Sequence, residues 1–388
     1  MGQMKNIHII VATGEWGQDQ LRYRRHRLAE YLQKHSDTKE VIWLCPSPTQ
    51  KEKSCSRLSN GIKQWTIQDL LPHKVFRFGR YIDEFHRSKL HPLIQYLREE
   101  QEKYKVNLWY TFPGYPILSD LFSWNKVVYD CSDLWTSPIS GKNSILANSR
   151  KNIISKAENR IIQRADVITC TSEYLSSRIV ENLGSQEKVF TFENGVEYDL
   201  FANNPTQMEN ILPAQFNGTV LGFIGGIKPK LDFDLIKEAA QKKREWLFLF
   251  VGPDGTNDHP KFKDLLTERN VLWTGSVEPS EVPKYMNLID IGIMPYKSSQ
   301  YNQAVFPLKL FEFLAAGKSV LGLHLPSTKK YAEESVYAYL DTDSTNQFIQ
   351  VCEQLEGTIN DENMIHKRKT LAKSKNWNEV FEDMFRLV

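Results

Sequence analysis

A lysine and a glutamate stand in a mostly apolar stretch, residues 301–324 (YNQAVFPLKLFEFLAAGKSVLGLH). Lys309 and Glu312 are three residues apart, so a helix would place them on one face. A carboxylate can accept hydrogen bonds from two ribose hydroxyls, and an ammonium can pair with a phosphate. The pair therefore has the chemistry of a nucleotide site. The alternative is a surface ion pair, worth about 0.3 kcal/mol.

The residues around this pair predict a loop, a helix and a strand. Pro307 fixes φ and suits a first helical turn, and Gly317 is typical of a helix C-terminus. The sequence LKLFEFLAA between them predicts the helix. The apolar run SVLGL that follows is of the buried-strand type.

The chain is long enough for about two domains, with 388 residues and a net charge of +2. No polyanion partner is indicated, and basic patches alone do not support nucleic-acid binding. Five scattered cysteines without a CxxC pair predict neither a zinc site nor a disulfide framework. We therefore expect a cytoplasmic protein, without a secretory leader or membrane span.

The first half reads as one α/β domain. Residues 6–12 (NIHIIVA) are a continuous apolar run, typical of a strand buried on both faces of a parallel sheet. A glycine-bearing loop, a helix at 21–35 and a second apolar run, VIWLCP, complete a β-loop-α-β unit. Six or seven strand candidates occur by residue 196, whereas strand signal is weak over 62–105.

The polar stretch 197–217 predicts a linker, after which the pattern restarts with about five parallel strands. We expect two Rossmann-like, doubly wound domains, 1–204 and 205–375, with a ligand cleft between them. The amphipathic helix 376–388 either finishes the second domain or crosses back onto the first.

Loops at the carboxyl ends of parallel strands face the ligand crevice. In the second domain, Gly225 and Gly226 precede Lys228 and Lys230, a pattern that suits a diphosphate, and the turn VGPDGT (251–256) follows the same logic. The loop MPYKSSQYNQAVFP exceeds the usual βα length, which indicates function. Each loop alone also fits an ordinary turn.

Together these strings resemble the donor-binding region of retaining GT-B glycosyltransferases. The matching positions in 271–324 are Gly275, Pro283, Asp290, Pro295, Pro307, Lys309, Glu312, Ala316 and Gly317. The strings ADVITCTSEYLSSRI and VFTFENGVEYDLF resemble the same family upstream. RYRRHRLAEYL and YDCSDLW are most similar to glycosyltransferases of bacterial teichuronic acid synthesis.

The resemblance implies a hexosyltransferase with a nucleotide-sugar donor, UDP-linked, and a lipid-linked or polymeric glycan acceptor. It places the ribose on Glu312 and the diphosphate near the glycine turn, with Lys228 and Lys230 expected to stabilise the leaving group. Many members have a glutamate where this chain has Ala304, so contacts to the donor sugar are expected from other residues. The expected donor-binding residues are Gly225, Gly226, Gly252, Pro253, Asn302, Gln303, Pro307, Leu308, Lys309 and Glu312.

The acceptor side is expected on the first domain. Its candidates are Trp16, Asp19, Arg24 and Arg25, although the arginines also fit a solvated helix face. Asp133, after a predicted strand, is the candidate acceptor-side catalytic group, with a turn or cap as the alternative. No metal or other cofactor is expected.

Residues 73–97 mix basic and aromatic side chains, with five Lys/Arg against two acids between Lys74 and Lys89. The segment fits contact with the anionic inner membrane surface, or equally a packed amphipathic helix. Two other functions remain open. A catalytically silent scaffold would be consistent with Ala304, and an epimerase would need paired acids or histidines that the sequence does not indicate.

Overall fold

The computed structural model describes residues 4–18, 21–47, 54–69, 81–139, 145–203, 211–213, 216–333 and 336–388. These residues group into two compact units. The first comprises the described parts of 1–138, 142–193 and 381–388, and the second those of 139–141 and 194–380. The first long segment thus ends at Glu193, whereas the expected boundary lies at residue 204.

The first unit contains a sheet with strand order β3-β4-β2-β1-β5-β6-β7-β8, parallel except for the β3–β4 pair. Its central strands are buried apolar runs, as the sequence predicts for strands covered on both faces. The strands are β1 (Asn6–Val11), β2 (Thr38–Ser47), β3 (Cys55–Arg57), β4 (Lys63–Gln68), β5 (Lys105–Tyr110), β6 (Lys126–Cys131), β7 (Val167–Cys170) and β8 (Val189–Thr191).

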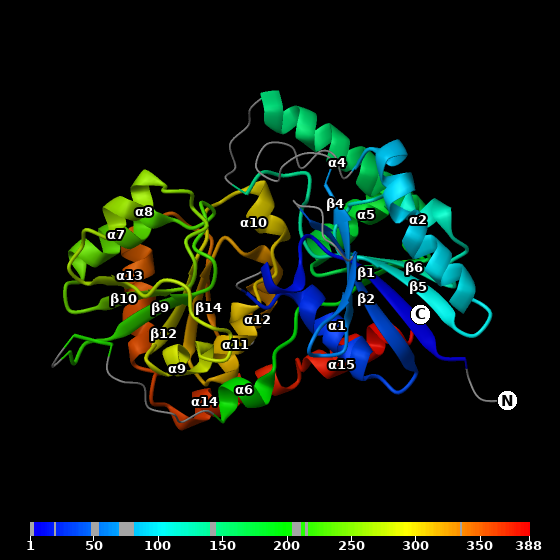
Figure 1. Cartoon of the computed structure of the whole chain (residues 1–388). Helices are drawn as coiled ribbons and strands as arrows, with labels where there is room; N and C mark the ends of the chain where they lie inside the picture. Colours follow the sequence, from blue (N-terminus) through cyan, green and yellow to red (C-terminus); the bar gives the residue numbers. More distant parts are fainter. Residues whose placement is uncertain are drawn as a thin grey trace. The chain divides into compact units, whose positions relative to one another are not determined.

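Helices flank this sheet (Figure 1). They are η1 (Trp16–Gln18), α1 (Arg24–Lys34), α2 (Asp83–Glu100), α3 (Leu118–Leu121), α4 (Ile145–Arg164) and α5 (Glu173–Leu183). The final helix, α15 (Trp377–Phe385), runs from the second unit into the first. Within the first unit, Tyr31 of α1 donates a 2.5 Å hydrogen bond to Glu382 and packs its ring 5.7 Å from that of Phe381.

The second unit contains a parallel sheet with strand order β11-β10-β9-β12-β13-β14. Helices α7, α8 and α13 pack together on one face, and α9 and α11 lie on the other (Figure 1). The strands are β9 (Val220–Ile224), β10 (Leu247–Val251), β11 (Val271–Trp273), β12 (Ile291–Pro295), β13 (Ser319–Leu323) and β14 (Ala338–Leu340). The helices are α6 (Tyr198–Ala202), α7 (Phe233–Lys242), α8 (Pro260–Leu265), α9 (Val282–Asn287), α10 (Gln300–Ala304), α11 (Lys309–Ala315), η3 (Pro326–Thr328), α12 (Lys329–Glu333), α13 (Thr345–Glu356) and α14 (Glu362–Lys373).

Three details differ from the sequence expectations. The region of weak strand signal includes a regular strand, β4, and the second sheet has a sixth strand, β14. The long loop after β12 folds in part into α10, which Ser299 caps by accepting a hydrogen bond from the Asn302 amide. Pro307 precedes the N-cap of α11, Leu308, and so lies just outside the first helical turn.

The structure bears on two expectations about membranes, the absence of a membrane span and the surface contact of residues 73–97. No helix in the described part of the chain is both long enough and apolar enough to cross a bilayer. Residues 73–80 of the basic and aromatic segment lie outside the described residues. Residues 83–97 lie in α2, whose apolar stripe, Leu90, Leu93 and Leu97, is fully buried.

Candidate active site

Glycine turns occupy the carboxyl edge of the second sheet. Gly225, Gly252 and Gly275 follow the adjacent strands β9, β10 and β11, and their φ angles are +136°, +134° and +77°. The Gly252 amide donates to the Gly275 carbonyl at 2.8 Å. A Cβ on Gly252 would lie 2.2 Å from the Gly225 carbonyl oxygen, so only glycine fits. The turns after β9 and β10 are therefore in direct backbone contact.

Lys309 of α11 lies across the first of these turns. A Cβ built on Gly225 would be 2.6 Å from Lys309 Cε and 3.2 Å from its Nζ. The ammonium is thus held beside backbone that has no side chain of its own. Such a place lets a bound anion meet both the cation and the glycine backbone at close range.

Glu312 completes this arrangement one helical turn later. Its Oε2 lies 4.0 Å from Lys309 Nζ, and the two side chains are only 11% and 18% exposed. An ion pair so little exposed is not the solvated surface pair that the sequence left open. Its two charges converge with Gly225 on the same carboxyl edge.

Helix α11 is fixed at its core face and at its end. Gly292 of β12 allows close packing, because a Cβ there would lie 2.5 Å from the Phe313 ring. At the end, the Lys318 amide donates to the Phe313 carbonyl and the Gly317 amide to that of Leu314, a Schellman cap. Buried Arg368 donates to the Gly317 carbonyl at 3.4 Å. Lys309 and Glu312 therefore project from a well-anchored helix.

The two lysines after β9 point to different neighbours. The aliphatic part of Lys228 lies against Gly255, with its Cγ 3.3 Å from where a Cβ would stand. Lys230 instead places its ammonium 4.8 Å from the ring centroid of Tyr296 and 5.6 Å from that of Tyr301. Contacts of this kind are worth about 0.5–1 kcal/mol each at exposed sites. Lys230 thus braces its loop on the residues that follow β12.

Asn302 and Gln303 differ sharply in their surroundings. Asn302 is fully buried, and its Nδ2 donates to the carbonyls of Lys230 and Lys297 at 3.2 and 2.8 Å. It ties the loops after β9 and β12 together, whereas Gln303 is exposed. Ala304, where the resemblance expects a glutamate, is fully buried.

The remaining expected donor residues lie on the same edge. Gly226 is half-buried beside Gly225, and the Pro253 carbonyl accepts from the Ile227 amide at 3.0 Å. Pro307 is buried and Leu308 is half-buried just ahead of Lys309.

In the first unit, the buried Arg24 side chain is bonded to other residues of the same unit. Its Nε lies 2.9 Å from Asp130 Oδ2, and the two residues are 4% and 1% exposed. Its Nη1 donates to the Glu193 carbonyl at 3.2 Å, and its guanidinium lies 5.8 Å from the Phe381 ring. Arg24 therefore connects α1 to β6, to the end of the first long segment and to the C-terminal residues of its own unit.

Trp16 belongs to an aromatic cluster. Its ring lies 4.9 Å from that of His26 and 4.8 Å from that of Trp43. Burial, aided by neighbouring arginines, lowers the pKa of His26 to about 3, so its imidazole is neutral at physiological pH. The half-buried Arg25 lies over the Tyr23 ring at 4.5 Å. Asp19 lies outside the described residues.

Asp133 lies two residues beyond β6 and is half-buried. Its carbonyl accepts from the Trp135 amide at 3.0 Å, as in a tight turn. Among the described residues, no group of three or more His, Cys, Asp or Glu is arranged to hold a metal ion.

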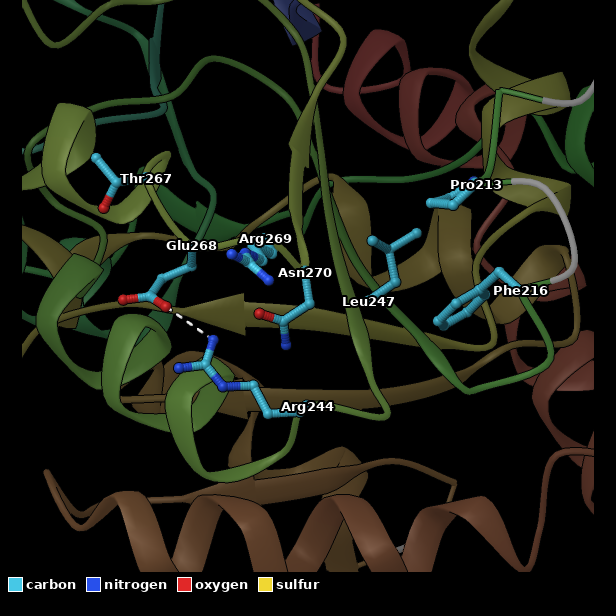
Figure 2. Close-up of a pocket in the computed structure, with 8 residues that line it drawn as sticks. All are labelled: Pro213, Phe216, Arg244, Leu247, Thr267, Glu268, Arg269 and Asn270. Carbon is cyan, nitrogen blue, oxygen red and sulfur yellow. Dashed lines mark hydrogen bonds and ion pairs between the residues drawn. The ribbon is translucent and has the colours of Figure 1, made fainter.

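A separate hollow of about 620 Å³ lies at the opposite, amino edge of β10 and β11 (Figure 2). Its lining includes Leu247, the first residue of β10, and Asn270, just before β11. Arg244 on its wall is paired with Glu268 at 2.9 Å. Ligands of parallel α/β sheets bind at carboxyl ends, so the glycine edge is the stronger candidate site.

Comparison with known proteins identifies the family. Residues 218–356 match the family model described as glycosyl transferases group 1. Over 382 residues, covering 98% of this chain and 96% of the relative, the chain is 54% identical to the putative teichuronic acid biosynthesis glycosyltransferase TuaH of Bacillus subtilis (strain 168). This chain belongs to the same glycosyltransferase family as that relative.

Solved structures agree on the fold of this glycosyltransferase. Sucrose-phosphate synthase from Thermosynechococcus elongatus matches with a TM-score of 0.76 at 13% identity, over 99% of this chain and 98% of that chain. Anabaena HepE, solved in complex with UDP and glucose, matches with a TM-score of 0.68 at 14% identity, over 99% of both chains. The fold is GT-B, as the sequence predicts.

Two features near the carboxyl edge of the second sheet are not among the sequence predictions. Tyr296 and Tyr301 contact the Lys230 ammonium, and only their place around the long loop could have pointed to them. Asn194 lies in the NGV part of the string VFTFENGVEYDLF, which by itself assigns the residue no role. The structure places its side chain against the loop before α11.

Proposed function

We propose that this glycosyltransferase moves a hexose, with retention, from a UDP-sugar to a cell-envelope polysaccharide or its lipid-linked precursor, such as teichuronic acid. The observation that best supports a nucleotide-sugar site is the Lys309–Glu312 pair, little exposed and set against Gly225. UDP is favoured because the GT-B neighbour HepE was solved with UDP and glucose. The acceptor class follows the name of the 54% identical relative.

The transfer requires the anomeric carbon to exchange one oxygen for another. The bond to the diphosphate oxygen breaks, a bond to an acceptor hydroxyl oxygen forms, and the hydroxyl proton passes to the departing diphosphate oxygen. In this proposal the Glu312 carboxylate accepts hydrogen bonds from the ribose hydroxyls, while the Lys309 ammonium pairs with the diphosphate. Lys228 and Lys230 stabilise the charge of the leaving UDP, and Asp133 is the acceptor-side polar group.

The same proposal needs no metal cofactor. Lysine ammonium groups at the glycine edge would balance the diphosphate charge that a divalent ion balances in other transferases. Transfer measured with and without a chelator should proceed at the same rate. A rate restored only by added Mg²⁺ or Mn²⁺ would refute this part.

The donor is tested by thermal unfolding in the presence of UDP, GDP and their sugars. A ligand at 100 times its Kd stabilises the folded protein by about 2.7 kcal/mol, so one nucleotide class should raise Tm selectively. The matched variant Glu312→Ala should lose most of that rise, while its own Tm without ligand changes little.

One observation favours a different function. Ala304 is buried where many relatives have a glutamate, which is consistent with a catalytically silent scaffold. If no nucleotide or nucleotide sugar shifts Tm, the scaffold is favoured and the enzyme proposal fails.

We also propose that the protein acts in the cytoplasm, peripherally at the inner membrane surface. Exposed Arg87 and Lys89 on α2 support the contact, because basic side chains near an anionic surface contribute about 1 kcal/mol each. The buried apolar stripe of α2 leaves its charged face as the part available to a membrane.

A further inference from the structure

The long segment of the second unit begins at Asn194, whose side chain reaches the loop before α11. Asn194 is 8% exposed, and its Nδ2 donates to the carbonyl oxygen of Phe306 at 2.7 Å. The two residues are 112 positions apart in the sequence. Phe306 is followed directly by Pro307, Leu308 and Lys309, so the contact lies at the start of the helix with the candidate site charges.

The loop between α10 and α11 is held by side chains at two successive carbonyls. Val305 accepts from Ser327 Oγ at 2.5 Å, and Phe306 accepts from Asn194 Nδ2. The Phe306 ring also packs 5.6 Å from Phe311 on α11. The position of this loop therefore depends on residues distant in sequence.

Asn194 is itself held from the other side. The Val196 amide donates to the Lys375 carbonyl at 2.8 Å, and the Trp377 amide donates to the Val196 carbonyl at 3.3 Å. A Cβ on Gly195 would lie 2.7 Å from the Lys375 oxygen, which leaves room only for glycine. The backbone beside Asn194 is thus fixed independently of the loop that its side chain holds.

We infer that Asn194 is a positioning residue for donor binding. By fixing the Phe306 carbonyl it sets where α11 begins, and so where Lys309 and Glu312 lie relative to Gly225. This inference rests on the proposed donor role of Lys309 and Glu312. A buried carbonyl deprived of its donor would draw the loop toward water or another donor, and α11 would begin elsewhere.

Asn194→Ala should weaken UDP binding about tenfold, measured by titration calorimetry well below the unfolding temperature. Amide hydrogen exchange over 307–312 should become faster in the same variant. If Asn194→Ala folds poorly, Asn194→Asp replaces it, because the side chain keeps its size but its carboxylate cannot donate to the Phe306 carbonyl.

The control is Asn203→Ala, which deletes an exposed amide in the same unit. Its Nδ2 bonds Asp199 at 3.5 Å, so UDP affinity should stay within about twofold of the unaltered chain. The decisive comparison is Asn194→Ala in a Lys309→Ala background. In that background Asn194 can act only through Glu312, so the second change should weaken UDP binding by clearly less than tenfold.

The outcomes distinguish a failure of the donor role of Lys309 from a failure of the positioning role of Asn194. If Lys309→Ala leaves UDP affinity unchanged, the proposed donor role of Lys309 fails, whatever Asn194 does. If Lys309→Ala weakens binding but the Asn194 variants lower only Tm, Asn194 is merely structural and the inference is overturned. Full additivity of the two changes also overturns it.

Discussion

Replacing Gly225 by alanine tests whether the contact between the glycine turn and Lys309 matters for donor binding. The new Cβ would stand 2.6 Å from Lys309 Cε, closer than real contacts allow. Because the atom it meets is near the end of a flexible side chain, the lysine can swing aside and the fold can survive. The ammonium would then leave its place beside the turn.

Two costs should follow, and they appear in different measurements. An alanine at φ +136° is strained by about 1–3 kcal/mol, which lowers the free energy of unfolding. Losing a charge-assisted contact to the diphosphate is worth about 1.5–3 kcal/mol. UDP affinity should therefore fall about 10- to 100-fold.

Gly184→Ala is the matched control. Gly184 also has a positive φ, +70°, but a Cβ there meets nothing within 4 Å, and it caps α5 in the first unit. It should lower the free energy of unfolding by a similar amount while UDP affinity stays unchanged. The reasoning would be refuted if Gly225→Ala kept full UDP affinity, or if Gly184→Ala lost as much.

Three further predictions concern charge. Lys228→Ala should lower kcat about 10- to 100-fold with little change in Tm. Lys230→Ala should lower both kcat and Tm, because the Lys230 ammonium also contacts two tyrosine rings. Equal effects of the two variants on Tm would contradict this prediction. Burial lowers the pKa of His26 to about 3, so between pH 6.5 and 3 protons bind the unfolded chain preferentially and stability falls as pH falls. His26→Gln should remove about 2 kcal/mol of the loss in free energy of unfolding between pH 6.5 and 5, measured by urea unfolding. The control is His91→Gln, which replaces an exposed histidine. Parallel pH profiles of the two variants would count against the prediction. Reversing the basic charges of 74–89 should reduce sedimentation with anionic vesicles, and equal pelleting would argue against membrane contact.

Much of the fold follows from local pattern. Runs such as LFLFV at β10 are apolar throughout, as strands covered on both faces must be, so the parallel sheets could be predicted. The sequence KQWTIQ at β4 lacks that signal, since Lys63, Gln64 and Gln68 interrupt it. Gln64 is tolerated because its side-chain oxygen accepts from the Trp16 amide at 2.7 Å, a partner that no local pattern indicates.

In the candidate site, too, some features follow from local sequence pattern and others depend on contacts between distant residues. Helical spacing and Gly317 place Lys309 and Glu312 on one face of a helix, and strand order places that helix near a glycine turn. Periodicity cannot show that the Arg24 guanidinium turns inward to Asp130, since the partner lies 106 residues away. Nor could it show that the Asn302 amide is used to join two loops.

The return of residues 381–388 to the first unit has a consequence for synthesis. Phe381 and Met384 are each 1% exposed, with Phe381 packed against Tyr31 of α1. A chain emerging from the ribosome must wait for residues 194–380 before these side chains can cover α1. At 5–20 residues per second this delay lasts roughly 10–40 s. During that time the nascent first unit exposes an apolar surface that a chaperone could occupy.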